Sequence, residues 1–183
     1  MSCRSAILID NFLDQNKFDN LSAKVAASSA YNTTTVQDLR DDLFTEVYTA
    51  VFDRLKEIKL YQPHFDESIK LFGYNQFRPA NEGYGNFNGP HFDHGGYVFY
   101  IHPHWDESWE GKIKITNADE EQYRNGIYAK PNRFIWIDPG TYHDVTTTAS
   151  NTTHARVANI AFLGGDIHVD PSGISFINIT TTT

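Results

Sequence analysis

Apolar residues recur at helical spacing in the first part of the chain. A helix is predicted over residues 11–28, with Asp10 as its N-cap. Its apolar face consists of Phe12, Leu13, Phe18, Leu21 and Val25. The polar residues 31–34 then separate this helix from a second one.

The second helix has the clearer stripe, at strict four-residue steps. Thr35 and Asp38 resemble a capping box in which Asp takes the place of Glu or Gln. The stripe predicts an amphipathic helix to about Ile58, which needs a sheet or another helix to cover it. It consists of Leu39, Leu43, Val47, Val51 and Leu55.

After Pro63 the pattern changes to short runs of aromatic and β-branched residues. Turns rich in Gly, Pro, Asn and Asp separate them, which is typical of an all-β sandwich or barrel. Strands are predicted at residues 69–77, 97–101, 112–116, 133–137, 156–163 and 173–179. The chain therefore predicts an α+β, mainly β, single domain, with a helical support over 1–62 and a β core over 63–183.

Composition narrows the function. The 183 residues carry a net charge of −8 with a pI near 5.4, so a nucleic-acid polymer is not an expected partner, although chemistry on a single base remains open. Cys3 is the only cysteine, which excludes an internal disulfide and Cys-based zinc sites. The apolar run at residues 6–9 is too short for a secretory signal or a membrane span, so we expect a cytoplasmic protein without a membrane partner. The sequence does not reveal its oligomeric state.

Three residues have the chemistry of an iron site. In an extended segment His91 and Asp93 lie on the same side, so both can reach one metal ion. His143 follows an apolar strand and the turn 138–142. Two His and one carboxylate occupy one face of an octahedron and leave positions open, as in iron(II) oxygenases, whereas zinc more often closes towards four ligands. The pair His91–Asp93 alone is a common chance match.

Arg156 is a charge on an otherwise apolar strand face, where burial is costly unless the charge is paired. Ala158, Ile160 and Phe162 share that face, and no Asp or Glu lies between Val145 and Leu163. A dicarboxylate ligand could pair with the guanidinium. The alternative is that Arg156 reaches a distant acid at the end of the strand.

Over residues 71–165 the chain resembles the prolyl 4-hydroxylase-like branch of the Fe(II)/2-oxoglutarate dioxygenases. The resemblance rests on an ordered set of motifs rather than on one of them. The set is His91-Phe92-Asp93, Tyr100-Ile101, Gly111-Lys112-Ile113, Pro131-Asn132-Arg133-Phe134-Ile135-Trp136, His143-Asp144-Val145 and Arg156-Val157-Ala158.

The resemblance implies a double-stranded β-helix of the jelly-roll, cupin-like kind and an oxygenase of the EC 1.14.11 type. His91, Asp93 and His143 would bind Fe(II), with no catalytic residue beyond them. Arg156 and Tyr100 would bind the C5 carboxylate of the co-substrate 2-oxoglutarate, and ascorbate is a candidate reductant. The chain departs from the pattern in the thirteen-residue gap from His143 to Arg156, which contains an enlarged turn.

A second departure is His102-Pro103-His104, where relatives often have Asn; we expect this segment at the surface, altering a rim rather than the metal site. The loop 79–90 is a candidate substrate lid. Candidate substrate-binding residues are Tyr84, Trp105 and Trp136.

The resemblance favours a Pro-containing peptide or protein as substrate. The alternatives are a free amino acid, another small metabolite or a nucleobase. A non-catalytic cupin-like module that keeps a metal for structure is the competing class of function.

Overall fold

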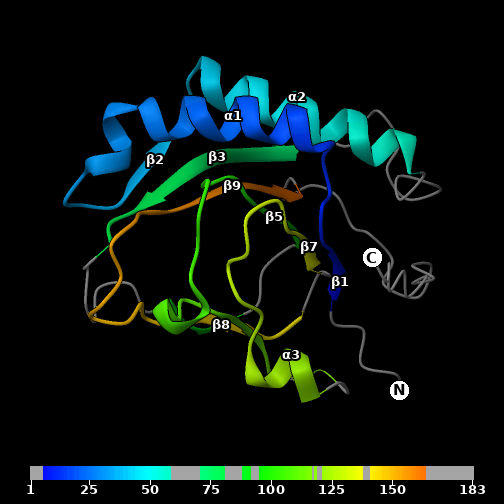
Figure 1. The fold of residues 1–183 in the computed structure, drawn as a ribbon. Helices are drawn as coiled ribbons and strands as arrows, with labels where there is room; N and C mark the ends of the chain where they lie inside the picture. The colour runs from blue at the N-terminus through cyan, green and yellow to red at the C-terminus, as the bar shows by residue number, and fades with distance from the viewer. Residues whose placement is uncertain are drawn as a thin grey trace.

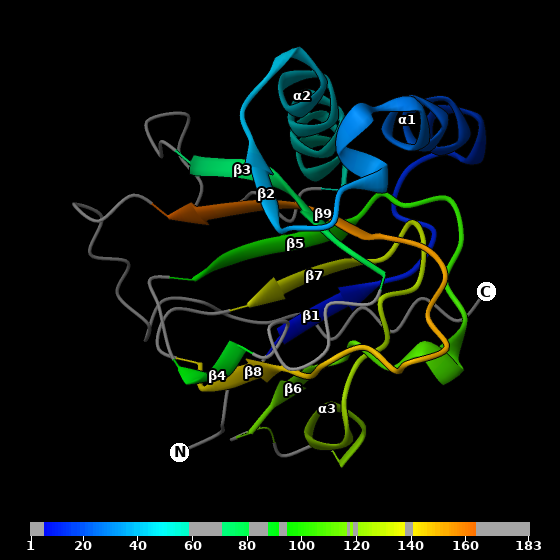
Figure 2. The same cartoon turned by 90° about the vertical axis from the view of Figure 1, so that its left-hand side faces the viewer.

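The computed structural model describes residues 6–58, 71–80, 88–91, 95–116, 118, 121–137 and 141–163. Within them, two helices, a larger sheet and a smaller sheet are stacked as layers (Figures 1 and 2). The larger sheet lies in the middle, with the helices on one of its faces and the smaller sheet opposite the other. The helices are α1 (Gln15–Ala27), α2 (Asp42–Glu57) and the short α3 (Glu121–Asn125), with 3-10 turns at Ser29–Asn32 and Glu107–Trp109.

The larger sheet has six strands in the order β1-β7-β5-β9-β3-β2, and the smaller has the order β4-β8-β6. All their pairings are antiparallel. The strands are β1 (Ala6–Ile9), β2 (Gln37–Leu39), β3 (Leu71–Arg78), β4 (Asn88–His91), β5 (Gly96–Tyr100), β6 (Ile113–Ile115), β7 (Phe134–Ile137), β8 (His143–Val145) and β9 (Arg156–Leu163).

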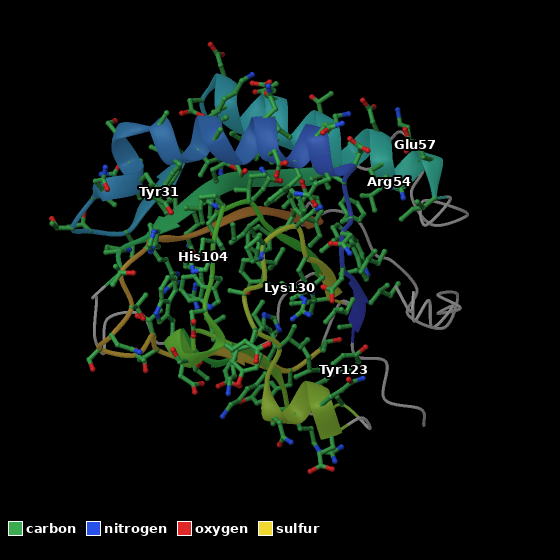
Figure 3. The ribbon with its side chains drawn as sticks, in the orientation of Figure 1. Tyr31, Arg54, Glu57, His104, Tyr123 and Lys130 are labelled. Atoms are coloured by element: carbon green, nitrogen blue, oxygen red, sulfur yellow. The ribbon has the colours of Figure 1, made fainter. Side chains whose placement is uncertain are left out.

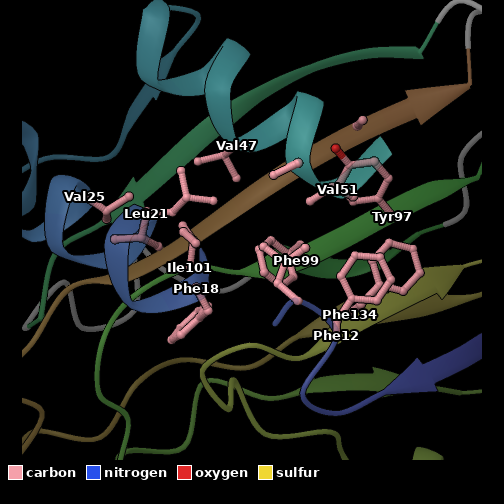
Figure 4. Packing of buried hydrophobic residues seen from close by; sticks show 14 of the residues in the cluster. Phe12, Phe18, Leu21, Val25, Val47, Val51, Tyr97, Phe99, Ile101 and Phe134 are labelled. Carbon is pink, nitrogen blue, oxygen red and sulfur yellow. The ribbon is translucent and has the colours of Figure 1, made fainter. Parts of the chain in front are cut away.

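One face of the larger sheet forms a core with α1 and α2. Phe99 and Phe134 of the sheet meet Phe12, whose ring stacks on Phe134 at a centroid distance of 4.4 Å (Figure 4). From the helices, Leu21 and Val51 pack into the same cluster. The apolar stripe of α2 is thereby removed from water. The same packing supports the strands that carry the site on their other face.

The C-terminal end of α2 is hydrogen-bonded to the segment that precedes α1. Ile58 caps the helix by donating its N–H to Arg54 O, and Arg54 forms an ion pair with Glu57 at 3.0 Å (Figure 3). Nε of Arg54 also donates to Phe12 O at 2.9 Å. A cation in the last turn is favourable because the helix dipole is negative there. The predicted end of this helix is thus confirmed.

The prediction that the first 60 residues are helical was incomplete. Residues 6–9 form β1, which pairs with β7, and residues 37–39 form β2, which pairs with β3. Consequently the helices begin later than predicted. Asp14 rather than Asp10 caps α1 by accepting from Asn16 N, and Asp41 rather than Thr35 caps α2 by accepting from Phe44 N.

The predicted strands agree more closely. β9 has the predicted bounds. β7 begins one residue later than predicted, and β3, β5 and β6 differ from their predictions by one or two residues at each end. The helix α3 was not predicted, and the strand predicted at 173–179 lies outside the described residues. In the described part of the chain, no helix has the length and apolar character needed to cross a membrane.

Candidate functional site

A cavity of about 100 Å³ lies between the two sheets. That is several times the roughly 10–15 Å³ that one water requires, so the cavity can take a small ligand. Residues of β3, β5 and β9 line it from the larger sheet, and residues of β6 and β8 from the smaller one. The polar side chains that line it are those of Tyr74, Gln76, Arg78, Tyr100, His143 and Arg156.

His143 is the first residue of β8 and is buried, with 6% of its surface exposed. Its Nδ1 lies 2.9 Å from Thr141 O. A carbonyl can only accept, so Nδ1 is the nitrogen that donates to it. A metal-binding histidine is held in the same way, with one nitrogen donating to a carbonyl and the other left to coordinate.

The backbone of His91 pairs with that of His143 in the β4–β8 ladder. Two predicted metal ligands, 52 residues apart in the sequence, are therefore neighbours across two strands. The side chain of His91 and the whole of Asp93 lie outside what the structure describes. Among the described residues, no three His, Cys, Asp or Glu side chains gather closely enough to hold a metal ion.

Arg156 begins β9 and is buried, with 4% of its surface exposed. Its Nη1 donates to Gly111 O at 2.8 Å, which fixes the guanidinium at one end of the cavity. Gly111 has φ +67°, and a Cβ added there would lie 2.8 Å from Nη1 of Arg156. Glycine is thus required both by the backbone and by the close approach of the guanidinium.

Tyr100 ends β5 and is buried in the same cavity. Burial raises the pKa of its hydroxyl, although the nearby charges of Arg156, Arg133 and Arg78 lower it. Tyr100 consequently keeps its proton at neutral pH and can donate a hydrogen bond. It pairs with Ala158 of β9, two residues from Arg156 and on the same face of the sheet.

The enlarged turn between His143 and Arg156 does not separate these two residues, since both line the cavity. The turn is held by backbone bonds from Gly111 N to Thr147 O (3.1 Å) and from Ala149 N to Trp109 O (2.8 Å). The longer gap in the sequence is therefore absorbed by a loop that folds back onto residues 109–111.

Two of the candidate substrate-binding residues do not line the cavity. Trp136 of β7 lies on the face covered by the helices, and Trp105 is packed beside Trp109 in a second buried cluster. Trp136 has 4% of its surface exposed and Trp105 has 8%. These buried positions argue against contact with a substrate. Tyr84 and most of the predicted lid lie outside the described residues.

His102 corrects a further expectation, because it is fully buried rather than at the surface. Nδ1 of His102 accepts from Val157 N at 3.0 Å, and Nε2 donates to Ala129 O at 2.6 Å. Burial lowers its pKa to about 4, so the ring is neutral at physiological pH. His102 is a structural link between β9 and the segment that precedes β7. His104, by contrast, is exposed.

Sequence reasoning missed several residues of the cavity, among them Arg78. It ends β3, one residue beyond the predicted strand, and its backbone pairs with that of Arg156. The alternation along β3 could have indicated it, since Tyr74, Gln76 and Arg78 share a face.

No family model matches the sequence, and no curated protein sequence matches it either. Solved structures do match the fold. A Pseudomonas putida prolyl-4-hydroxylase has a TM-score of 0.61 and 14% identity, with 86% of this chain and 91% of that chain covered.

Two further structures are similar. A Trichoplax adhaerens prolyl hydroxylase in complex with a hypoxia inducible factor peptide fragment has a TM-score of 0.56 and 13% identity, covering 86% of this chain and 82% of that one. A viral collagen prolyl hydroxylase from Paramecium Bursaria Chlorella virus-1, in a 2OG complex, has a TM-score of 0.54 and 13% identity, covering 87% and 96%. This chain has the prolyl hydroxylase-like fold of the 2-oxoglutarate/Fe(II) oxygenases.

Proposed function

We propose that the protein is an Fe(II)- and 2-oxoglutarate-dependent hydroxylase acting on a prolyl residue of a peptide or protein. The observation that carries the proposal is the convergence of His143, Tyr100 and Arg156 in one cavity between the two sheets. These residues come from three different strands. His143 matches a metal ligand of the family to which the fold is similar, and Tyr100 and Arg156 match its site for the C5 carboxylate. The two sheets would form the double-stranded β-helix.

In this proposal His91, Asp93 and His143 hold Fe(II). The donor set suits that ion, and the bond from Nδ1 of His143 to Thr141 O would orient the ring as in a metal-binding histidine. The ladder supports the assignment, because directly opposite residues of antiparallel strands lie on one face. When bound, iron and 2-oxoglutarate together activate dioxygen, so that oxidative decarboxylation to succinate is coupled to hydroxylation of a substrate C–H bond.

The chain's own residues bind and orient the co-substrate. The guanidinium of Arg156, fixed by Gly111 O, would receive the C5 carboxylate, and the hydroxyl of Tyr100 would donate to the same group. Ile113, Ile137 and Ile160 line the cavity and would keep water from the ligand.

The substrate is supported less directly than the class of chemistry. One structure of similar fold is a prolyl hydroxylase bound to a peptide fragment. The net charge of −8 suits a peptide better than a nucleic-acid strand.

An anaerobic titration tests the class. Adding Fe(II) and 2-oxoglutarate to the wild type should give a weak visible charge-transfer band, which His143→Ala and Asp93→Ala should lack. His104→Ala is the matched control, because His104 is exposed and does not line the cavity. Iron-loaded wild type without the band would favour the non-catalytic metal-binding module.

A second assay tests the substrate. Pro-rich peptides incubated with the protein, Fe(II) and 2-oxoglutarate should gain the mass of one oxygen atom. If no peptide gains oxygen while free amino acids, other metabolites or nucleosides do, the prolyl assignment is wrong and the class of chemistry stands.

A further inference from the structure

Two arginines face each other across adjacent strands in the cavity. Arg78 of β3 and Arg156 of β9 are directly paired in the ladder, so their side chains share a face of the sheet. Both line the cavity that contains Tyr100 and His143. Arg156 is buried and Arg78 is half-buried, which places Arg156 deeper and Arg78 nearer to solvent.

Two guanidinium charges on one face of the sheet repel each other. Like charges directly opposite in an antiparallel ladder destabilise it, and partial burial strengthens their repulsion. Arginine cannot relieve the repulsion by losing its proton. An anion bound between the two guanidinium groups would offset this repulsion.

Hydrogen bonds orient both guanidinium groups. Arg156 donates from Nη1 to Gly111 O at 2.8 Å, and Arg78 donates from Nε to Oε1 of Gln76 at 2.7 Å. The charges of both arginines also act on the hydroxyl of Tyr100, whose pKa they lower against the effect of burial.

We propose that Arg78 is a second arginine for the C5 carboxylate of 2-oxoglutarate, so that Arg78 and Arg156 hold this carboxylate between them. The inference rests on the proposed function. A carboxylate has roughly four acceptor sites. The fork of Arg156 fills two and Tyr100 a third, which leaves one for Arg78 on the opposite strand. The consequence is selectivity for a 2-oxo acid with a second carboxylate.

The test measures binding rather than turnover. Protein loaded with Mn(II) in place of iron is titrated with 2-oxoglutarate by calorimetry, for wild type and Arg78→Gln. Loss of one charge-assisted hydrogen bond should raise the Kd by about 10- to 100-fold. Arg78→Lys, which keeps the charge but loses the fork, should fall between them.

Oxalate separates the two ends of the ligand. It chelates the metal as the 2-oxo and C1 carboxylate groups do, but has nothing to place at the arginines. We therefore expect an equal Kd for oxalate in wild type and Arg78→Gln. Arg40→Gln, which removes an exposed arginine, should change neither Kd.

The outcomes are distinct. An equal Kd for 2-oxoglutarate in wild type and Arg78→Gln would overturn the inference. If that equal Kd were accompanied by a higher KM for a peptide, Arg78 would contact the substrate instead. Equal weakening of oxalate would overturn it too, because Arg78 would then act at the C1 end. If the wild type binds no 2-oxoglutarate, the proposed function itself fails.

Discussion

Replacing Gly111 by alanine tests whether the position of Arg156 controls co-substrate binding. The new Cβ would lie 2.8 Å from Nη1 of Arg156 and 3.2 Å from side-chain carbons of Thr148 and Trp105. The residue would also have to keep φ at +67°, where L side chains are strained. Both effects arise at a residue that would not itself contact the ligand.

The magnitudes follow from this geometry. The left-handed backbone costs roughly 1–2 kcal/mol for a residue with a Cβ. Non-bonded heavy atoms pack at about 3.5 Å, so the guanidinium of Arg156 must move by roughly 0.7 Å. When a positioning group is displaced by nearly an ångström, the function that depends on it can fall by one to two orders of magnitude. We therefore expect the Kd of 2-oxoglutarate to rise about tenfold.

Urea denaturation measures the free energy of unfolding, and calorimetry on the Mn(II)-loaded protein measures the Kd. Gly126→Ala is the matched control, because Gly126 also has a positive φ, of +115°. The three atoms nearest to a Cβ at Gly126 all belong to Lys112, with Cδ at 2.7 Å and Cβ at 2.9 Å, and none belongs to Arg156. Both variants should lose stability, and only Gly111→Ala should lose affinity.

Two results would refute the reasoning. If Gly111→Ala is destabilised but binds 2-oxoglutarate as the wild type does, the guanidinium of Arg156 does not set the affinity. If Gly126→Ala weakens binding equally, the effect reflects general loss of stability rather than the position of Arg156.

Three further changes have defined outcomes. Tyr100→Phe should raise the Kd of 2-oxoglutarate about tenfold with little loss of stability, since it removes one hydrogen bond to a charged group; an unchanged Kd would exclude Tyr100 from the carboxylate site. The pKa of His102 in the folded protein, about 4, lies below its ordinary 6.5, so the unfolded chain binds more protons between these values and stability falls as pH drops from about 6.5 to 4, by about 3 kcal/mol in all. Urea denaturation across this range should show a shallower slope for His102→Gln, and equal slopes would contradict a buried neutral ring. Burial raises the pKa of Asp10, but the paired bonds from Arg133, at 2.6 and 3.0 Å, bring it below 3.8. Asp10→Asn should therefore cost about 1 kcal/mol near neutral pH, and its difference from wild type should vanish as pH falls through the lowered pKa, which the same denaturation series measures.

The strands and helices with a strong local pattern could be predicted from the sequence. The stripe of α2 ends where the structure ends it, and the alternation along β9 placed Arg156, Ala158 and Ile160 on the cavity face. Such patterns are readable because the period of side chains along a helix or strand is a property of the local backbone. Arg156 was identified from this alternation, His143 from its place after an apolar strand and a turn, and Tyr100 from the resemblance to the family. The structure brings all three to one cavity.

Pairing between distant segments could not be predicted. The four residues of β1 are too few to show a period, and they become a strand only because β7, more than 120 residues later, supplies their hydrogen bonds. For the same reason no local signal placed Arg78 opposite Arg156.

Burial of polar side chains was likewise decided by tertiary structure. His102 looked like a surface residue beside a proline, yet the N–H of Val157 and the carbonyl of Ala129 make its burial favourable. Trp136 looked like a substrate contact, yet the helices cover its face of the sheet. The sequence by itself determined which residues have the chemistry of the site, and the packing of two sheets and two helices decided which of them face the cavity, because that depends on partners far along the chain.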